Sequence, residues 1–365
     1  MIQTERNTLI KERFKAWWKR SKIDRPLMYI VAKRDDPLPG FFEFGEPKTH
    51  EEMYTDADRI FAWKQHFFRT HKLMADALPW LDANFGPGSI ALYIGSEPIF
   101  ARDTVWYEEC VNDWATHPDF KVDAKNKWWK MHIEIYKRLK ELAKGEFALA
   151  IPDLIENVDI LSAMRGPMDF CYDLIDEPEL IKKFVGQVDD LYFKYYDEMY
   201  ELVKEPDGSS SFTAFHVWGP GKTAKVQCDF SALMNPAQFR EFVVPSLRKQ
   251  CMQLDNSIFH LDGKDCIKHL DALMEIEELD ALQWTAGAGQ PDGSSEIWYP
   301  VYDKVKAAGK ALWVSIDDGG IDDWIKSGDR IVERYGIDGL YLLFGNTMTE
   351  AEAEKLITHA ERNWH

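Results

Sequence analysis

The chain has few cysteines and lacks any long apolar run. Its five cysteines are scattered over 365 residues and form no CxxC pair, which disfavours a disulfide framework and a zinc ribbon. No stretch approaches the ~20 apolar residues that a bilayer-spanning helix needs. The first residues lack the charged-then-apolar order of a secretory signal. We therefore expect a cytoplasmic protein without a membrane partner.

Basic residues are scarce as well. Lysine and arginine total 44 against 62 aspartates and glutamates, and the formal net charge is −18. Nucleic-acid phosphates are bound by clustered lysines and arginines, so we expect no nucleic-acid partner. Neither G-x-G-x-x-G nor G-x-x-x-x-G-K-[ST] opens a predicted helix, which disfavours a dinucleotide fold and a P-loop.

Apolar residues, in contrast, make up 45% of the chain and aromatic residues 13%, enough for a large core. Short apolar runs alternate with amphipathic segments along most of its length. The strands predicted are 27–33, a segment near 81 or at 90–93, 147–151, 212–216, 257–260, 281–284, 311–316 and 340–344. The helices predicted are 4–20, 51–75, 125–144, 178–203, 236–253, 266–274, 300–308, 321–335 and 350–363.

This alternation predicts an α/β protein with a parallel sheet and helices outside it. Eight such units favour a (β/α)8 TIM barrel, preceded by an N-terminal helix, as a single domain over residues 1–365. Residues 95–129 are an aromatic-rich insertion with Trp106, Trp114, Trp128 and Trp129. Long insertions often lie near the active-site mouth of a barrel. A cluster packed on the flank of the barrel is the alternative.

The strand end around His260 is the most informative segment. His260 and Asp262 are two residues apart, so both side chains project to the same side of the strand. They stand at its carboxyl end, where (β/α)8 enzymes carry their active sites. An imidazole and a carboxylate at such a position form either a metal half-site or an acid/base pair. A buried histidine bonded to a backbone carbonyl, and an aspartate that caps the next helix, are the structural alternatives.

Other strand ends carry further candidates. Asp317 is a candidate catalytic carboxylate, although a capped turn before two glycines is the alternative. Cys228, in a polar loop, is a candidate metal ligand or nucleophile, with an inert thiol as the alternative. Glu156 could instead stabilise a helix N-terminus, and Trp284 could pack in the core. The residues predicted to bind substrate are Lys33, Arg34, Glu156, His216, Trp218, Trp284 and Asn346.

The half of the chain from Phe212 onward resembles the uroporphyrinogen decarboxylase superfamily. The resemblance rests on the strand end His260-Leu-Asp-Gly263, on Leu282-Gln-Trp284 with the glycine-rich loop after it, on Val314-Ser-Ile-Asp-Asp318, and on the helix-like segment 234–245. The resemblance implies a (β/α)8 barrel with one of two chemistries. One is decarboxylation of acetate side chains without a cofactor. The other is methyl transfer, in which zinc activates a thiol and a corrinoid protein carries the methyl group.

The chain departs from both patterns. Decarboxylases of this group carry an arginine-rich Gly-Arg-Tyr segment after the first strand, where this chain has Ala32-Lys33-Arg34-Asp35-Asp36. Thiol-activating methyltransferases carry His-x-Cys-Gly and a second cysteine, where this chain has His260-Leu-Asp262-Gly263 and Leu343-Phe-Gly-Asn346. A zinc site built from His260, Asp262 and Cys228 or another carboxylate remains chemically reasonable. Such a site suits the polarisation of a methoxy oxygen better than the binding of a soft thiolate.

The sequence therefore predicts a substrate-specific methyltransferase that moves a methyl group from a small O- or N-methylated compound to a corrinoid protein. Zinc is the expected cofactor, and a second copy of the chain is a further candidate partner. The alternative is a cofactor-free decarboxylase of a different acid. In that case Asp262 or Asp317 donates the proton, and Lys33 or Arg34 pairs with the substrate carboxylate. A non-catalytic barrel that binds a small molecule is the second alternative.

Overall fold

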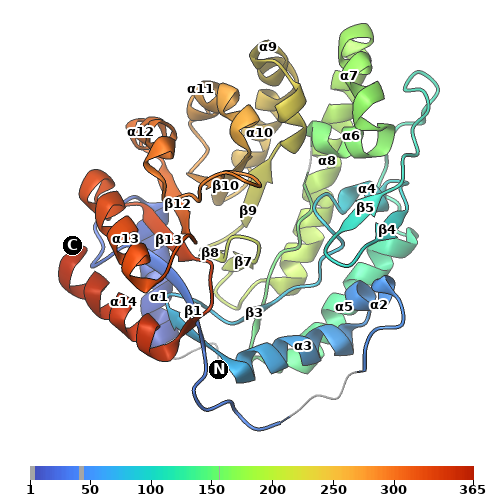
Figure 1. The fold of residues 1–365 in the computed structure, drawn as a ribbon. Helices are drawn as coiled ribbons and strands as arrows, with labels where there is room; N and C mark the ends of the chain where they lie inside the picture. The colour runs from blue at the N-terminus through green and yellow to red at the C-terminus, as the bar shows by residue number, and fades with distance from the viewer. Residues whose placement is uncertain (1–4, 41–44, 156) are drawn as a thin grey trace.

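A largely parallel sheet surrounded by helices forms the frame of the protein (Figure 1). The structure is a computed structural model that describes residues 5–40, 45–155 and 157–365. The main sheet has eight strands in the order β14-β1-β13-β12-β11-β10-β9, with β2 antiparallel to β1. The predicted mixed α/β class is thus confirmed. The strands are β1 Leu27–Lys33, β2 His71–Ala75, β9 Thr223–Gln227, β10 Asn256–Asp262, β11 Ala281–Thr285, β12 Ala311–Ile316, β13 Leu340–Phe344 and β14 Met348–Thr349.

Six shorter strands form three separate pairs. β3 and β6 are parallel, whereas β4 with β5 and β7 with β8 are antiparallel hairpins. A single parallel bridge joins Ile151, just after β6, to Phe212 at the end of β7. The bounds are β3 Trp80–Leu81, β4 Pro98–Phe100, β5 Val105–Tyr107, β6 Ala148–Leu149, β7 Ser210–Phe212 and β8 Val217–Gly219.

Several helices begin where a side chain caps the first turn. Thr349 and Glu352 form a capping box at the start of α14, and Asn235 and Gln238 form another at the start of the short helix Pro236–Gln238, so side chains satisfy backbone N–H groups at both helix starts. Of the helices that the structure describes, none has the length and apolar content that a membrane crossing needs. The longer helices are α1 Glu5–Trp18, α3 Ala57–Thr70, α5 Lys127–Ala143, α6 Asn157–Arg165, α7 Pro167–Asp176, α8 Pro178–Val203, α10 Val244–Cys251, α12 Tyr299–Ala307, α13 Ile321–Tyr335 and α14 Glu350–Asn363.

Two predictions of secondary structure are wrong, and a third is confirmed in one of its two alternatives, because the segment near residue 81 forms β3. The run Ile90–Tyr93, one of two candidates for the second strand, forms the short helix α4. The predicted helix 51–75 ends at Thr70, and its last residues form β2. The predicted strand 212–216 ends at Phe212, because the next residues form a hairpin turn in which His216 has a φ of 52°. Short, fully apolar runs carry no period that separates helix from strand.

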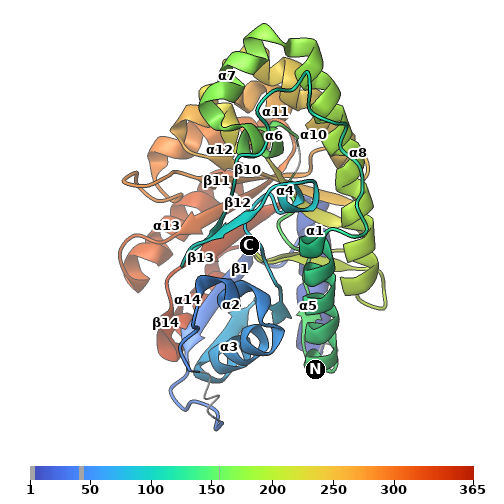
Figure 2. The same cartoon turned by 90° about the vertical axis from the view of Figure 1, so that its right-hand side faces the viewer.

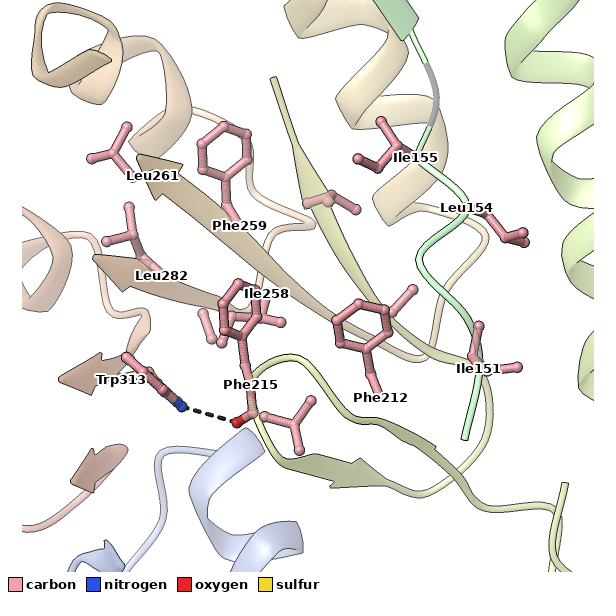
Figure 3. Packing of buried hydrophobic residues seen from close by; sticks show 14 of the residues in the cluster. Ile151, Leu154, Ile155, Phe212, Phe215, Ile258, Phe259, Leu261, Leu282 and Trp313 are labelled. Carbon is pink, nitrogen blue, oxygen red and sulfur yellow. Dashed lines mark hydrogen bonds between the residues drawn. The ribbon is translucent and has the colours of Figure 1, made fainter. Parts of the chain in front are cut away.

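The turn between β7 and β8 packs against one face of the main sheet. Phe215 lies 5.7 Å from Trp313 of β12, whose indole nitrogen donates to the Phe215 carbonyl at 3.1 Å (Figure 3). Tyr341 of β13 donates to the carbonyl of His216 at 2.8 Å. Ile258 of β10 lies on the same side as Phe215. The turn therefore fills the space beneath β10, β12 and β13 with aromatic rings.

The aromatic-rich insertion packs mainly onto helices. Its segment before α5 runs along α8 toward α7 (Figure 2). Trp114 is buried 4.9 Å from Phe184 of α8 and donates to Asp173 of α7 at 2.8 Å. Trp128 and Trp129, at the start of α5, are buried as well, whereas Trp106 is 64% exposed. Most of these aromatic residues thus form a packed cluster.

Candidate metal centre

The register of β9, β10 and β11 brings polar side chains together at the carboxyl ends of these strands. His260 pairs with Gln227 on one side and with Gln283 on the other. Two residues further on, Asp262 pairs with Thr285, and Asp229, the first residue of the 3-10 helix that follows β9, lies close to Asp262. Because side chains alternate along a strand, the two rows face the same side of the sheet.

Asp229, His260 and Asp262 form a group that could hold a metal ion. Their ligand atoms lie within 4.8 Å of one another, and His260 Nε2 is 3.9 Å from Asp262 Oδ2. Ligands that share a tetrahedral zinc at about 2.0–2.2 Å lie about 3.4 Å apart, so the side chains must close by up to about 1.4 Å. One imidazole and two carboxylates suit zinc or another divalent cation. The residues present therefore fit a metal in chemistry and nearly in spacing.

Neighbouring residues hold His260 with one ring nitrogen directed at the carboxylates. Its Nδ1 contacts Gln283 Oε1, and the amide nitrogen of Gln283 donates to Thr285 Oγ1 at 2.8 Å. Since Gln283 presents its oxygen, His260 Nδ1 carries the hydrogen and Nε2 keeps a free lone pair. The Phe215 ring packs against the imidazole at 5.0 Å. This arrangement fixes the tautomer that a metal ligand needs.

The surroundings also keep His260 neutral. Burial, followed by the positive charge of Lys225, lowers the pKa of His260 to about 4. Metal ions bind the neutral imidazole and compete with protons for its lone pair. His260 is thus ready to act as a ligand at neutral pH.

The buried Lys225 determines which end of the Gln227 side-chain amide points toward Asp229. Lys225 Nζ lies 2.6 Å from Asp153, and the two side chains are 3% and 9% exposed. Lys225 also donates to Gln227 Oε1, which turns the amide nitrogen of Gln227 toward Asp229 Oδ2 at 3.0 Å and Asp159 Oδ2 at 3.3 Å. A lysine has only donors, so it fixes the acceptor end of the amide.

Asp159 of α6 fixes the backbone at the end of β9. The backbone N–H groups of Asp229 and Phe230 donate to its two carboxylate oxygens, each at 2.9 Å. Partial burial, followed by repulsion from Asp159, raises the pKa of Asp229 to about 7. Asp229 is exposed to solvent, and water screens part of this repulsion. Among the three ligand candidates, Asp229 is the carboxylate whose pKa is raised toward neutral pH.

Cys228, a metal ligand candidate from the sequence, lies outside this group. Its side chain is buried, and burial followed by the charges of Asp159 and Asp229 raises the pKa of the thiol well above its usual range. The strand alternation turns Cys228 away from the face of Gln227, and the next residue, Asp229, joins the group instead. A pattern in the sequence could have identified Asp229, because Lys225, Gln227 and Asp229 are polar residues at every second position. This segment is not among the predicted strands.

Asp317 and Asn346 lie together in a second loop network. The Asn346 amide donates to the Asp317 carbonyl at 2.5 Å, and the Asp317 carboxylate accepts from Gly345 N at 3.1 Å. Asp292 accepts from the backbone N–H of Asp317 at 2.6 Å. Burial raises the pKa of Asp317. In the described ranges, no hydrogen bond or ion pair joins Asp317 to the metal group.

The three aromatic candidates lie inside the protein. His216 stacks on Tyr29 at 3.8 Å, and burial lowers its pKa to about 3. Trp218 is 1% exposed and donates to Glu205 at 2.9 Å. Trp284 is 0% exposed. Trp218 and Trp284 are therefore core residues in this structure, with no surface open to a ligand.

The remaining predicted substrate-binding residues are Lys33, Arg34 and Glu156. Lys33 is exposed at the end of β1. Arg34 donates from Nε to the carbonyls of Phe68 and His71 at 3.2 and 3.0 Å, where α3 ends. Glu156 lies outside the described residues. The structure thus brings His260 and Asp262 together as predicted and adds Asp229.

Comparison of the chain with protein-family models and with curated proteins finds no match. The resemblance to the uroporphyrinogen decarboxylase superfamily therefore stays a prediction from the residues around His260. The chemistry that the site can perform rests on its own side chains.

Proposed function

We propose that the protein is a metal-dependent methyltransferase. It takes a methyl group from a small O- or N-methylated compound and passes it to a corrinoid held by a partner protein. The observation that carries the proposal is the convergence of Asp229, His260 and Asp262 at the carboxyl ends of β9 and β10. Parallel α/β folds place their active sites at that edge of the sheet.

The ligand set suits this chemistry. Cleavage of a methyl–oxygen bond requires that the leaving oxygen be protonated or bound to a cation. A zinc ion held by the three side chains would supply a Lewis acid for that oxygen or nitrogen. Gln283 keeps His260 in the ligating tautomer, and Phe215 covers one side of the imidazole. Two carboxylates favour an oxygen or nitrogen substrate over a soft thiolate.

The proposal includes a (β/α)8 barrel in the cytoplasm. β3 pairs with β6 in parallel, and a parallel bridge joins Ile151 to Phe212; these parallel pairings outside the main sheet support a barrel. Tyr107 of the aromatic insertion donates to the carbonyl of Phe85, shortly after β3, which supports a place near the barrel mouth. None of the five cysteines, all of which the structure describes, forms a disulfide, as is expected in a reducing compartment.

Cofactor-free decarboxylation is the second candidate, and one observation favours it. Asp229, with a pKa raised to about 7, can hold a proton at neutral pH and give it to the carbanion that remains after carbon dioxide leaves. This reaction needs no metal. The two candidates therefore differ in a property that can be measured directly.

The test is elemental analysis of the purified, tag-free protein after zinc has been supplied. We expect near-stoichiometric zinc in the wild type and in a His359→Ala control, because His359 lies on α14 beside Asp329. His260→Ala should lose the metal. Zinc-loaded protein is then assayed for methyl transfer to a free corrinoid. A wild type that takes up no zinc contradicts the proposal, and metal-independent release of carbon dioxide would establish the decarboxylase.

A further inference from the structure

A cavity of about 910 Å³ is lined by residues from the N-terminal part of the chain, between Gly45 and Arg102. It is bounded by α2 (His50–Thr55), by α3, by the β4–β5 hairpin and by the residues after β3. Figure 1 shows α2 close to the hairpin. Its lining residues do not include Asp229, His260 or Asp262. The volume lies within the range of small-molecule sites.

One wall of this cavity is a face of α3. Arg59, Trp63 and His66 are spaced at i, i+4 and i+7, so they lie on the same side of the helix, and all three line the cavity. Trp63 is 64% exposed. An indole that is exposed beside a cavity presents a flat surface on which an aromatic ring can stack.

Another part of the lining is the tip of the β4–β5 hairpin. Tyr54 of α2 donates to the Ala101 carbonyl at 2.9 Å, and His50 Nδ1 contacts the Phe100 carbonyl at 3.3 Å. These contacts fix the hairpin tip, which carries the exposed Arg102. Within the ranges that the structure describes, the Arg102 guanidinium has no hydrogen-bond or ion-pair partner. Its donors therefore stay available to an anion.

The floor follows β3 and adds little negative charge. Lys64 lies 3.5 Å from Asp82, which also accepts from Thr213 Oγ1 at 2.8 Å. Asn84 Oδ1 is buried and has no hydrogen-bond partner in the described part of the chain. A buried acceptor without a donor costs free energy, which a ligand hydroxyl or amide would recover. The exposed Glu46 is the other acid in the lining.

We infer that this cavity binds a small aromatic carboxylate. The carboxylate pairs with Arg102 through charge-assisted hydrogen bonds, and the ring stacks on Trp63. The chain carries a net charge of −18, which repels anions elsewhere on the surface. A guanidinium without an acidic partner is therefore needed to attract the carboxylate of the ligand. The inference goes beyond the proposed function and does not rest on it.

The test is calorimetric titration of the full chain with benzoate, after treatment with a chelator so that no metal can bind the carboxylate. We expect binding at one site in each chain. Benzamide keeps the ring and lacks the charge, and acetate keeps the charge and lacks the ring; each should bind at least about tenfold more weakly. Absence of benzoate binding at millimolar concentration would overturn the inference.

Matched variants locate the site. Trp63→Ala and Arg102→Gln should each weaken benzoate binding by about tenfold or more. Trp106→Ala, at the same 64% exposure, and Arg362→Gln, on the exposed surface of α14, should leave it unchanged. Thermal melting checks that every variant folds. Unchanged affinity in both cavity variants, or equal losses in the controls, would overturn the inference. His260→Ala should bind benzoate normally, which separates this result from the fate of the proposed function.

Discussion

His260 and Gln283 are register partners on the parallel strands β10 and β11, and the Gln283 side-chain oxygen contacts His260 Nδ1. An amide thus orients the histidine of the candidate metal group. A neutral acceptor fixes the tautomer without the added negative charge that a carboxylate would bring. Two carboxylates, Asp229 and Asp262, already face the other ring nitrogen, so a third is not needed for charge balance with a divalent cation.

This relationship predicts that Gln283→Leu weakens zinc binding. Leucine has similar bulk but leaves His260 Nδ1 without an acceptor, so the imidazole loses its fixed orientation. Loss of such an outer partner costs about 10–100-fold in metal affinity. Competition with a chromophoric chelator measures the change, and Gln253→Leu, at an exposed position, is the control. Equal affinity in the wild type and Gln283→Leu would show that the amide does not position the ligand.

Zinc binding should depend on pH through Asp229. Burial and repulsion from Asp159 raise the pKa of Asp229 to about 7, and a carboxylate must lose its proton to bind metal. Zinc affinity should therefore rise with pH through this value. The pKa of His260 is lowered to about 4, so protonation of His260 does not change the zinc affinity near pH 7.

Two variants isolate this step. Asp229→Asn should bind zinc more weakly and lose the dependence on pH near neutrality, because the amide does not titrate. Cys228→Ala should keep both the affinity and the pH dependence, since the buried thiol lies outside the group. Chelator competition over about pH 6 to 8 covers the relevant range. A flat wild-type profile would contradict the role of Asp229.

The sequence predicts His260 and Asp262 as site residues because both lie on one predicted strand, at a spacing of two residues. Asp229 is not predicted because β9 carries Lys225 and Gln227 among its apolar residues, which breaks the pattern of a buried strand. Lys225 is acceptable there because Asp153 is 2.6 Å away, although 72 residues separate them in the chain. Such pairing depends on the fold, so a single sequence does not reveal it.

Contacts that depend on the fold also explain why the positions of the tryptophans and of the short helices and strands could not be predicted from the sequence. Trp218 follows a predicted strand end, yet it is buried against Phe14 of α1, and Trp18 donates to its carbonyl from 200 residues away. Strands β1, β10, β11, β12 and β13 were predicted because they are long apolar runs between turns. Ile90–Tyr93 also carries a β-branched and an aromatic residue, but a run of four apolar residues fits a helix turn equally well.

The buried pair of Lys225 and Asp153 predicts a large loss of stability in Lys225→Met. The methionine fills similar space but leaves the Asp153 carboxylate buried without a cation, which costs about 3–5 kcal/mol. The free energy of unfolding from denaturant titration measures this. Lys249→Met is the control, since Lys249 and Asp190 form a pair at 2.6 Å whose side chains are 44% and 68% exposed. If both variants lose the same small amount of unfolding free energy, then burial does not make removal of the Lys225 cation more costly.

Asp189 predicts how stability changes with pH. It lies on α8, is 9% exposed and accepts from Ser246 Oγ. Burial raises its pKa to about 6, whereas an unfolded aspartate titrates near about 3.9. Between these values the folded state keeps a proton that the unfolded state releases. The contribution of Asp189 to stability is therefore complete at low pH and is lost as the pH rises through about 6.

Asp189→Asn removes this titration and keeps the polar contact with Ser246. The variant should match the wild type at acidic pH and become more stable than it above neutral pH, by up to about 3 kcal/mol, because a pKa difference of two units corresponds to that free energy. Urea unfolding at a series of pH values measures the difference. Asp190→Asn, its exposed neighbour, should not show the same rise. If the profiles of the wild type and Asp189→Asn run parallel, then Asp189 is already ionised in the folded protein at low pH and its burial does not control its charge.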